Sequence, residues 1–216
     1  EMKQQTPVSR DRRINTYVQC ITDAILAEVP SRVSWEVTVF DDDAVNAFAL
    51  PGGKIGVYTG LLKVADGQDQ LAAVIAHEIA HVTADHSNAR VSAAYATQTG
   101  LQLAQAMAGA ASPQKAQLWG LLGVGLQMGV LLPYGRGQES EADILGLEYM
   151  ARAGFNPAAS ISLWENMGKA GGNQPPEFMS THPSHQTRMR DLNNAMPGAR
   201  QLFNQAVANG KRPQCG

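Results

Sequence analysis

The residues best suited to do chemistry lie in one short run, His77-Glu78-Ile79-Ala80-His81, which has the pattern H-E-x-x-H. On a helix, residues four apart lie on the same face, so two imidazoles at this spacing can bind one metal ion. The glutamate beside them can take a proton from a metal-bound water and later give it to a leaving amine. The run therefore predicts a zinc-dependent peptide hydrolase in which His77 and His81 bind zinc and Glu78 activates the water. The competing interpretation is a pair of core histidines, which are costly to bury without compensation.

The third metal ligand is not obvious from the nearest histidine. Catalytic zinc sites use three protein ligands and leave a fourth position open. His86 follows His81 by five residues, and the pattern that places a third histidine ligand nearby needs glycine at 84 and histidine at 87. The chain has Ala84 and Ser87 instead, so His86 is not expected to bind the metal.

An acidic run, residues 139–143 (ESEAD), offers better ligands. On a helix, Glu139 and Asp143 share a face, whereas Glu141 lies about 200° from Glu139, so only one of the two glutamates can face the metal. We expect Glu139 as the ligand and Asp143 as the acceptor for the N–H of a ligand histidine. The alternative is a solvated helix face that carries all three carboxylates.

The elements that would position these residues can be read from the hydrophobic periodicity. We expect helices at 10–29, from 69 onwards, within 92–132, and at 137–152, 157–167, 186–195 and 198–208. Asp66 or Asp69 is expected to cap the helix that begins near 69, and a short helix should open at 59 or 60. We expect strands at 33–40, 44–50 and 54–58, and a loop at 168–186. This order predicts an α+β, mainly helical fold with a small antiparallel sheet beside the active-site helix, in a single domain over residues 1–216.

Composition narrows the class of protein further. The 216 residues are 44% hydrophobic and 17% charged with a net charge of −2, which is typical of a folded protein and gives no sign of nucleic-acid binding. The longest apolar stretch, 118–132, is shorter than the roughly 20 residues that a membrane helix needs. Cys20 and Cys215 lie near opposite ends of the chain; they could pair in an oxidising compartment or remain free thiols.

Three motifs in order, HEIAH, ESEAD and STHPSHQTR, together with the segment VNAFALPGGKIGVYTGLL, resemble the Ste24/HtpX-type zinc metallopeptidases, a gluzincin family. The resemblance is closest to compact soluble bacterial members such as LoiP, BepA and the bacterial relatives of the mitochondrial Oma peptidase. It covers roughly residues 15–195. The family pattern implies a zincin-like fold with Glu139 as zinc ligand, in agreement with the argument from helix faces.

The resemblance also implies roles for residues beyond the motifs HEIAH and ESEAD. It places His182 near the metal, where it would stabilise the oxyanion or act as a removable fourth ligand. It places Arg188 beside a carboxylate of the site, although a surface arginine is the alternative. It also implies that the strand with Asn46, Ala47 and Phe48 borders the cleft, where an edge strand can pair with substrate backbone. These three residues are therefore expected to bind substrate, with Asn46 orienting it; the alternative for Asn46 is an ordinary turn residue at a strand end.

The expected function is a metalloendopeptidase with one Zn²⁺ per chain that acts on misfolded or regulatory polypeptides. The resemblance alone implies a role in protein quality control and a periplasmic or outer-membrane location, as a lipoprotein or secreted protein. It also implies a peripheral membrane or outer-membrane assembly partner. The membrane-embedded relatives carry several spanning helices and this chain has no such stretch, so an intramembrane role is not expected. The alternative is a latent or non-catalytic scaffold or chaperone of the same fold.

Overall fold

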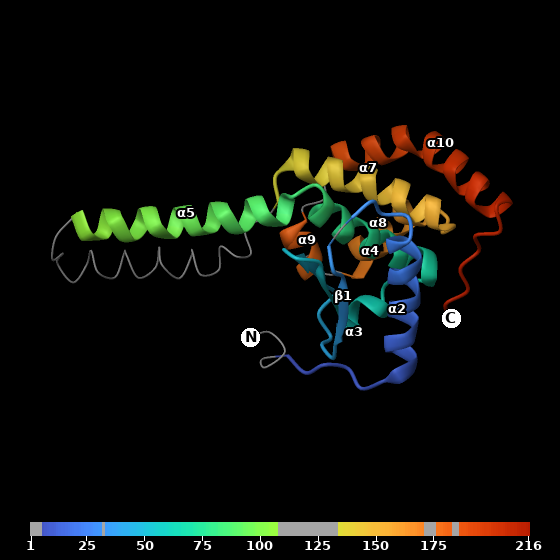
Figure 1. Ribbon diagram of the computed structural model, residues 1–216, viewed down its shortest axis with the longest axis horizontal. Helices are drawn as coiled ribbons and strands as arrows, with labels where there is room; N and C mark the ends of the chain where they lie inside the picture. Colours follow the sequence, from blue (N-terminus) through green and yellow to red (C-terminus); the bar gives the residue numbers. More distant parts are fainter. Residues whose placement is uncertain (1–5, 32, 108–133, 171–175, 183–185) are drawn as a thin grey trace.

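The computed structural model describes residues 6–31, 33–107, 134–170, 176–182 and 186–216 (Figure 1). The elements are, in order, α2 (Arg12–Leu26), β1 (Glu36–Phe40), β2 (Ala47–Leu50), β3 (Lys54–Tyr58), α3 (Thr59–Leu62), α4 (Gln68–Thr83), α5 (His86–Met107), α7 (Arg136–Ala153), α8 (Ala159–Ala170), α9 (Glu177–Thr181) and α10 (Gln186–Ala208). The expected mainly helical α+β class is confirmed.

Helix α4 lies at the centre of the molecule, and every residue from Gln70 to Val82 is buried. A helix that is apolar nearly all round is stable only inside a core. Helix α7 packs along α4 and is covered in turn by α10, while α2, α8 and the sheet contact other sides of α4 (Figure 1). The residues with the H-E-x-x-H pattern therefore lie in the best-protected helix of the described chain.

The sheet is mixed, so the expectation of an entirely antiparallel sheet is wrong in one pairing. Strands β2 and β3 form the expected antiparallel hairpin, but β1 pairs in parallel with β3, and the order is β1-β3-β2. The chain reverses twice between β1 and β3, and two reversals restore the original direction. Strand β3 lies in the middle and β2 becomes the edge strand next to α4.

The helix starts follow different rules in α2 and α4. In α2 the carboxylate of Asp11 caps the helix by accepting from the backbone N–H groups of Arg13 and Ile14. The expected acidic cap of α4 is wrong, because its N-cap is Gly67 and no side chain caps it. The carboxylate of Asp69 instead accepts from the backbone N–H of Asn156, 3.0 Å away, and so joins α4 to the chain after α7.

Two further expectations fail near the C-terminus. The expected pair of helices is one continuous helix, α10, with Pro197 inside it. An internal proline costs a helix about 3 kcal/mol. Buried side chains before and after the proline, such as Leu192 and Ala199, pack on both sides of it and offset that cost. The expected loop contains the short helix α9, which lacks enough periodic residues to be recognised.

Helix α5 begins next to the core and projects away from the rest of the molecule (Figure 1). None of the described helices is both long enough and apolar enough to span a membrane. The apolar stretch at 118–132, and with it part of the expected helical region, lies outside the described residues.

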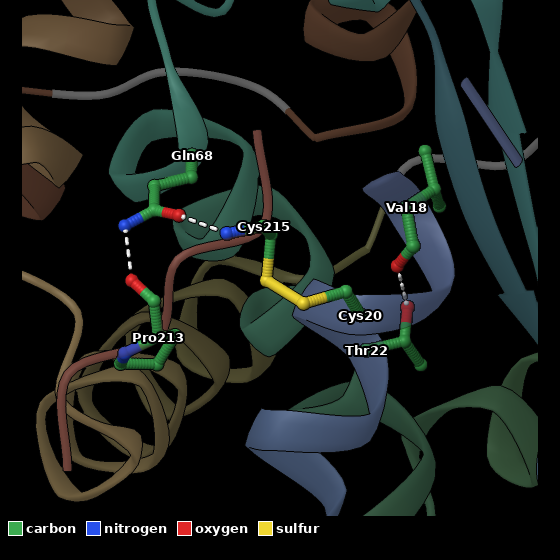
Figure 2. The surroundings of a disulfide bond; sticks show 6 residues. All are labelled: Val18, Cys20, Thr22, Gln68, Pro213 and Cys215. Carbon is green, nitrogen blue, oxygen red and sulfur yellow. Dashed lines mark hydrogen bonds between the residues drawn. A yellow bond between two sulfur atoms is a disulfide. The ribbon is translucent and has the colours of Figure 1, made fainter. Parts of the chain in front are cut away.

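A disulfide between Cys20 and Cys215 ties the C-terminal tail to α2, which confirms the pairing (Figure 2). The same tail is bonded to the first residue of α4. The backbone N–H of Cys215 donates to the side chain of Gln68 at 2.9 Å, and Gln68 Nε2 donates to the carbonyl of Pro213 at 2.7 Å (Figure 2). The tail therefore connects α2 to the start of the central helix.

Removal of this disulfide is expected to destabilise the fold. The bond links residues 195 positions apart, so it restricts the unfolded chain strongly. We expect C20S, C215S and the double variant each to lower the free energy of unfolding by about 2–5 kcal/mol in denaturant titrations. The double variant should match the single ones. If the single variants are as stable as the wild type, the bond does not restrict the unfolded chain in this way.

Candidate metal centre

Two imidazoles on α4 turn towards one point. The Nε2 atoms of His77 and His81 lie 3.0 Å apart, one helical turn from each other, and both rings are buried. Glu78, between them in sequence, is also buried and reaches the same region. Helix α4 thus brings the three polar side chains of its motif together in the buried interior.

Helix α7 places two carboxylates against these rings. Glu139 Oε1 lies 3.3 Å from His81 Nε2, and its Oε2 lies 3.8 Å from His77 Nε2. One turn later, Asp143 Oδ1 lies 3.0 Å from the other ring nitrogen of His77, Nδ1. This arrangement agrees with the sequence-based expectation. Glu139 lies beside the Nε2 atoms of the two histidines, and Asp143 lies beside Nδ1 of His77.

A third imidazole comes from the end of α9. His182 is buried, and its Nδ1 lies 3.3 Å from the carbonyl oxygen of Phe178 and 2.9 Å from Thr181 Oγ1. A carbonyl only accepts, so Nδ1 can donate there and leave a lone pair on Nε2. That Nε2 lies 3.3 Å from Glu78 Oε1, which puts His182 across the site from α4.

Arg188 of α10 holds the acidic residues in place. It is only 2% exposed. Its Nε and Nη2 donate to the two carboxylate oxygens of Asp143, each at 2.6 Å, and its Nη1 contacts Glu139. The guanidinium also lies over the ring of Trp164, with Cζ 4.4 Å from the centroid. The arginine is therefore not on the surface, and it is the counter-charge of both α7 carboxylates.

Burial keeps the imidazoles neutral. Desolvation lowers the pKa of His77, against the opposing effect of Asp143. The pKa values of His81 and His182 fall well below the usual range, first through burial and then through the positive charge that His77 would carry. Neutral imidazole is the form that binds a metal ion, so all three rings are in the state that ligation requires.

The carboxylates respond to burial in two ways. Desolvation raises the pKa of Glu139 to about 8, although Arg188 opposes the shift. It also raises the pKa of Glu78 well above its usual range, and the charge of Glu139 adds to that effect. Burial would raise the pKa of Asp143 too, but hydrogen bonds from Arg188 and His77 outweigh it and lower the pKa. The negative charges of Glu78 and Glu139 are therefore costly in this structure, and a cation beside the two imidazole nitrogens would lower that cost.

The donor set identifies the kind of cation that would fit. One donor atom each from His77, His81, Glu139 and His182 lie within 4.8 Å of one another, and all four residues are buried. Imidazole nitrogen with carboxylate oxygen suits zinc and several other first-row ions. Among the described residues this is the one group of this composition.

The three residues expected to contact substrate are engaged within the fold. Asn46 Nδ2 donates to Glu177 Oε1 at 3.0 Å, which ties the start of β2 to α9. Ala47 is buried, and the ring of Phe48 packs against the rings of Phe40 and Tyr58. These contacts hold the three side chains within the fold, and β2 is an edge strand whose Ala49 carbonyl accepts from Ser87 Oγ at 3.2 Å.

Two contacts of His81 were not expected from the sequence. The ring of Tyr134 stacks on it with centroids 3.8 Å apart. On its far side, His81 Nδ1 lies 3.1 Å from His86 Nδ1, and His86 Nε2 lies 3.1 Å from Glu141 Oε2. Tyr134 precedes α7 outside any periodic pattern, so no sequence signal marked it. His86 and Glu141 were considered in the sequence only as metal ligands, and neither was expected to bind the metal.

A buried H-E-x-x-H helix packed against a second helix that turns a glutamate to the same point defines the gluzincin class of metallopeptidase folds. Comparison with known families agrees, since the pattern of peptidase family M48 matches residues 9–196. The chain belongs to peptidase family M48.

Curated relatives have names that fit this family. The mitochondrial metalloendopeptidase OMA1 of Schizosaccharomyces pombe is 40% identical over 186 residues, which cover 85% of this chain and 53% of that protein. The OMA1 protein of Saccharomyces cerevisiae is 34% identical over 81% of this chain and 50% of its own length. The beta-barrel assembly-enhancing protease of Yersinia pestis is 30% identical over 90% of this chain and 41% of its own length. The chain thus spans about half the length of the relatives it matches.

The contact between α7 and α4 depends on Gly146. A Cβ atom at this position would lie 2.9 Å from His77 N and 3.0 Å from the carbonyl carbon of Ala76. We expect G146A to push the helices apart, to lower the free energy of unfolding by about 1–3 kcal/mol, and to weaken metal binding. Gly137 of the same helix has open space around it, so G137A should leave both properties unchanged or add up to about 1 kcal/mol of stability. Denaturant titration and zinc titration of both variants test this, and equal behaviour would contradict it.

Proposed function

We propose that this chain is a zinc-dependent metalloendopeptidase, a single domain that hydrolyses peptide bonds in misfolded or regulatory polypeptides. The observation that carries the proposal is the convergence of His77, His81 and Glu139 on one buried point, with the Glu78 carboxyl beside them. Two imidazoles and one glutamate are the protein ligands of catalytic zinc in gluzincins. Membership of peptidase family M48 supports the same reaction.

In this proposal His77, His81 and Glu139 hold one zinc ion per chain. When bound, the ion would polarise the scissile carbonyl and make water more acidic. Asp143 accepts from His77 Nδ1 and so fixes its tautomer, while Arg188 fixes Asp143. Availability in the cell contributes to the choice of metal, since such donors accept several divalent ions.

Glu78 is the proposed general base and acid. It takes a proton from the attacking water and delivers it to the leaving amide nitrogen. A carboxyl group does both most effectively when its pKa lies nearer to neutrality than usual, and burial raises the pKa of Glu78 in that direction. The carboxylate therefore suits a proton shuttle better than an exposed glutamate would.

His182 is proposed to act at the reacting centre. Its Nε2 lies 3.3 Å from Glu78. In the tautomer in which Nδ1 accepts from Thr181 Oγ1, 2.9 Å away, Nε2 carries the hydrogen and can donate to an oxyanion that forms beside Glu78. One observation favours a second role, because His182 belongs to the same four-donor group as the three ligands. Four protein donors would complete a tetrahedral shell and leave the enzyme latent until His182 moves away.

The edge of β2, the disulfide and the curated relatives support the proposed substrate and location. An extended peptide could pair with the edge of β2, which borders α4. The disulfide fits an oxidising compartment, and the likeness to a protein named beta-barrel assembly-enhancing protease favours the periplasm or outer membrane. An outer-membrane assembly partner and lipoprotein attachment are proposed on that likeness alone.

The E78Q variant tests the function. The amide keeps the size of the side chain but cannot take up a proton. We expect E78Q to bind one zinc per chain, as the wild type does, and to cleave unfolded casein about 100- to 10,000-fold more slowly. Metal content by elemental analysis and product formation by electrophoresis give the two readouts. E148Q is the matched control, because Glu148 is partly exposed on α7 and pairs with Arg152.

The outcomes separate the proposal from its competitors. Zinc in both proteins and cleavage by neither would indicate the alternative, a latent or non-catalytic scaffold or chaperone. Equal cleavage by both would exclude Glu78 as the base. Absence of zinc from both would rule out the ligand set.

His182 can be tested in the same assay. If it stabilises the oxyanion, H182A should retain zinc and lose about 100-fold in rate. A faster H182A enzyme would instead identify the side chain as an inhibitory fourth ligand. An unchanged rate would exclude both roles.

A further inference from the structure

His86 lies where α5 begins, and a sharp turn brings it back to the metal site. In one uninterrupted helix, residues five apart point in directions about 140° apart and cannot meet. Here α4 ends at Thr83, and Asp85 has a positive φ of 59°, which is rare outside glycine. The side chain of Asn88 donates to the carboxylate of Asp85 and so stabilises this turn. The result is a histidine that is only 6% exposed and faces the outer side of the His81 ring.

The two rings meet through their Nδ1 atoms, 3.1 Å apart. Close approach of two ring nitrogens is favourable only if one donates and the other accepts. His81 binds metal through Nε2 in the proposed function, so its Nδ1 carries the hydrogen. It follows that His86 accepts at Nδ1 and carries its own hydrogen on Nε2.

Glu141 receives that second hydrogen. Its Oε2 lies 3.1 Å from His86 Nε2, and its side chain is 58% exposed. The contact explains why the acidic run has a third carboxylate on a different face of α7 from Glu139 and Asp143. All bonds in the chain His81–His86–Glu141 then have a defined direction, from the metal ligand to the carboxylate.

We propose that His86 is a positioning residue for the metal site, which accepts the Nδ1 hydrogen of His81 and is itself oriented by Glu141. The proposal rests on the proposed function in one respect, that His81 binds metal through Nε2. The effect would be to fix the tautomer and ring orientation of His81, as Asp143 does for His77. One ligand histidine thus has a buried carboxylate as its outer partner, and the other has the ring of His86, which connects it to a carboxylate near the surface.

The test compares substitutions that keep different parts of this chain of bonds. In H86N, the amide oxygen can occupy the place of Nδ1 and accept from His81, but the side chain is too short to reach Glu141. In H86Q, the amide reaches the place of Nε2 but offers no acceptor at that of Nδ1. H86L has neither. Zinc affinity is measured for the 216-residue chain by competition with a chromogenic chelator, and the unfolding of each metal-free protein is measured alongside.

We expect H86L and H86Q to bind zinc about 10- to 100-fold more weakly than the wild type, and H86N to remain within about threefold of it. With Co²⁺ in place of zinc, the visible spectrum should change in H86L and H86Q but not in H86N. E141L should weaken zinc binding by a smaller factor, and E148L, on the same helix, should not change it. The Glu141 position is partly exposed, so E141L tests the same bonds even if H86L does not fold.

The result that would overturn the proposal is a set of His86 variants that bind zinc as tightly as the wild type, whatever their stability. An equal loss in H86N and H86Q would also overturn it, because then the acceptor at Nδ1 would not matter. Zinc binding by the wild type itself tests the proposed function, so the two failures are distinguishable.

Discussion

The cost of burying carboxylates next to histidines governs this structure. Glu139 and Asp143 are taken out of water in the middle of the molecule, and an unpaired buried charge is strongly unfavourable. Arg188 compensates for both, with paired hydrogen bonds to one and a contact to the other. Because the arginine belongs to α10, the charge pairing and the packing of α10 on α7 support each other. Removal of Arg188 would leave both carboxylates buried without their counter-charge.

The central helix, α4, has to satisfy a second constraint, since its polar side chains lie among apolar ones. Each ring of the motif has a partner on its outer side: His77 has a carboxylate on α7, and His81 has the imidazole of His86 at the start of α5. The partners come from two different elements, α7 and α5. The orientation of the two rings therefore depends on how α5 and α7 dock, and the close approach at Gly146 brings α7 near enough.

Much of the fold followed from periodicity. The apolar spacing in α2, the hairpin of β2 and β3, and the stop of α7 at Gly154 all agree with local rules, and Gly154 has the left-handed φ of 91° expected of a helix end. The errors arose where long-range contacts overrode local preference. Pro197 stays within α10 because packing on both sides outweighs the lost hydrogen bond. The parallel pairing of β1 depends on which strand it meets in space, and no local pattern encodes that.

The sequence by itself determined which residue types the candidate site offers and which of them share a helix face. The faces follow from the spacing in H-E-x-x-H and between Glu139 and Asp143, because they depend only on the 3.6-residue turn. Tertiary structure alone decided which of these residues meet. His86 is five residues past His81, a spacing that separates them on a continuous helix, and it reaches the ring only because the chain turns at Asp85. Arg188 could equally have been a surface residue. It is 45 positions from Asp143 in the sequence, and the two side chains meet only because α10 packs on α7. Local spacing constrains direction along one helix, whereas contacts between helices depend on how the whole chain buries its charges and apolar surface.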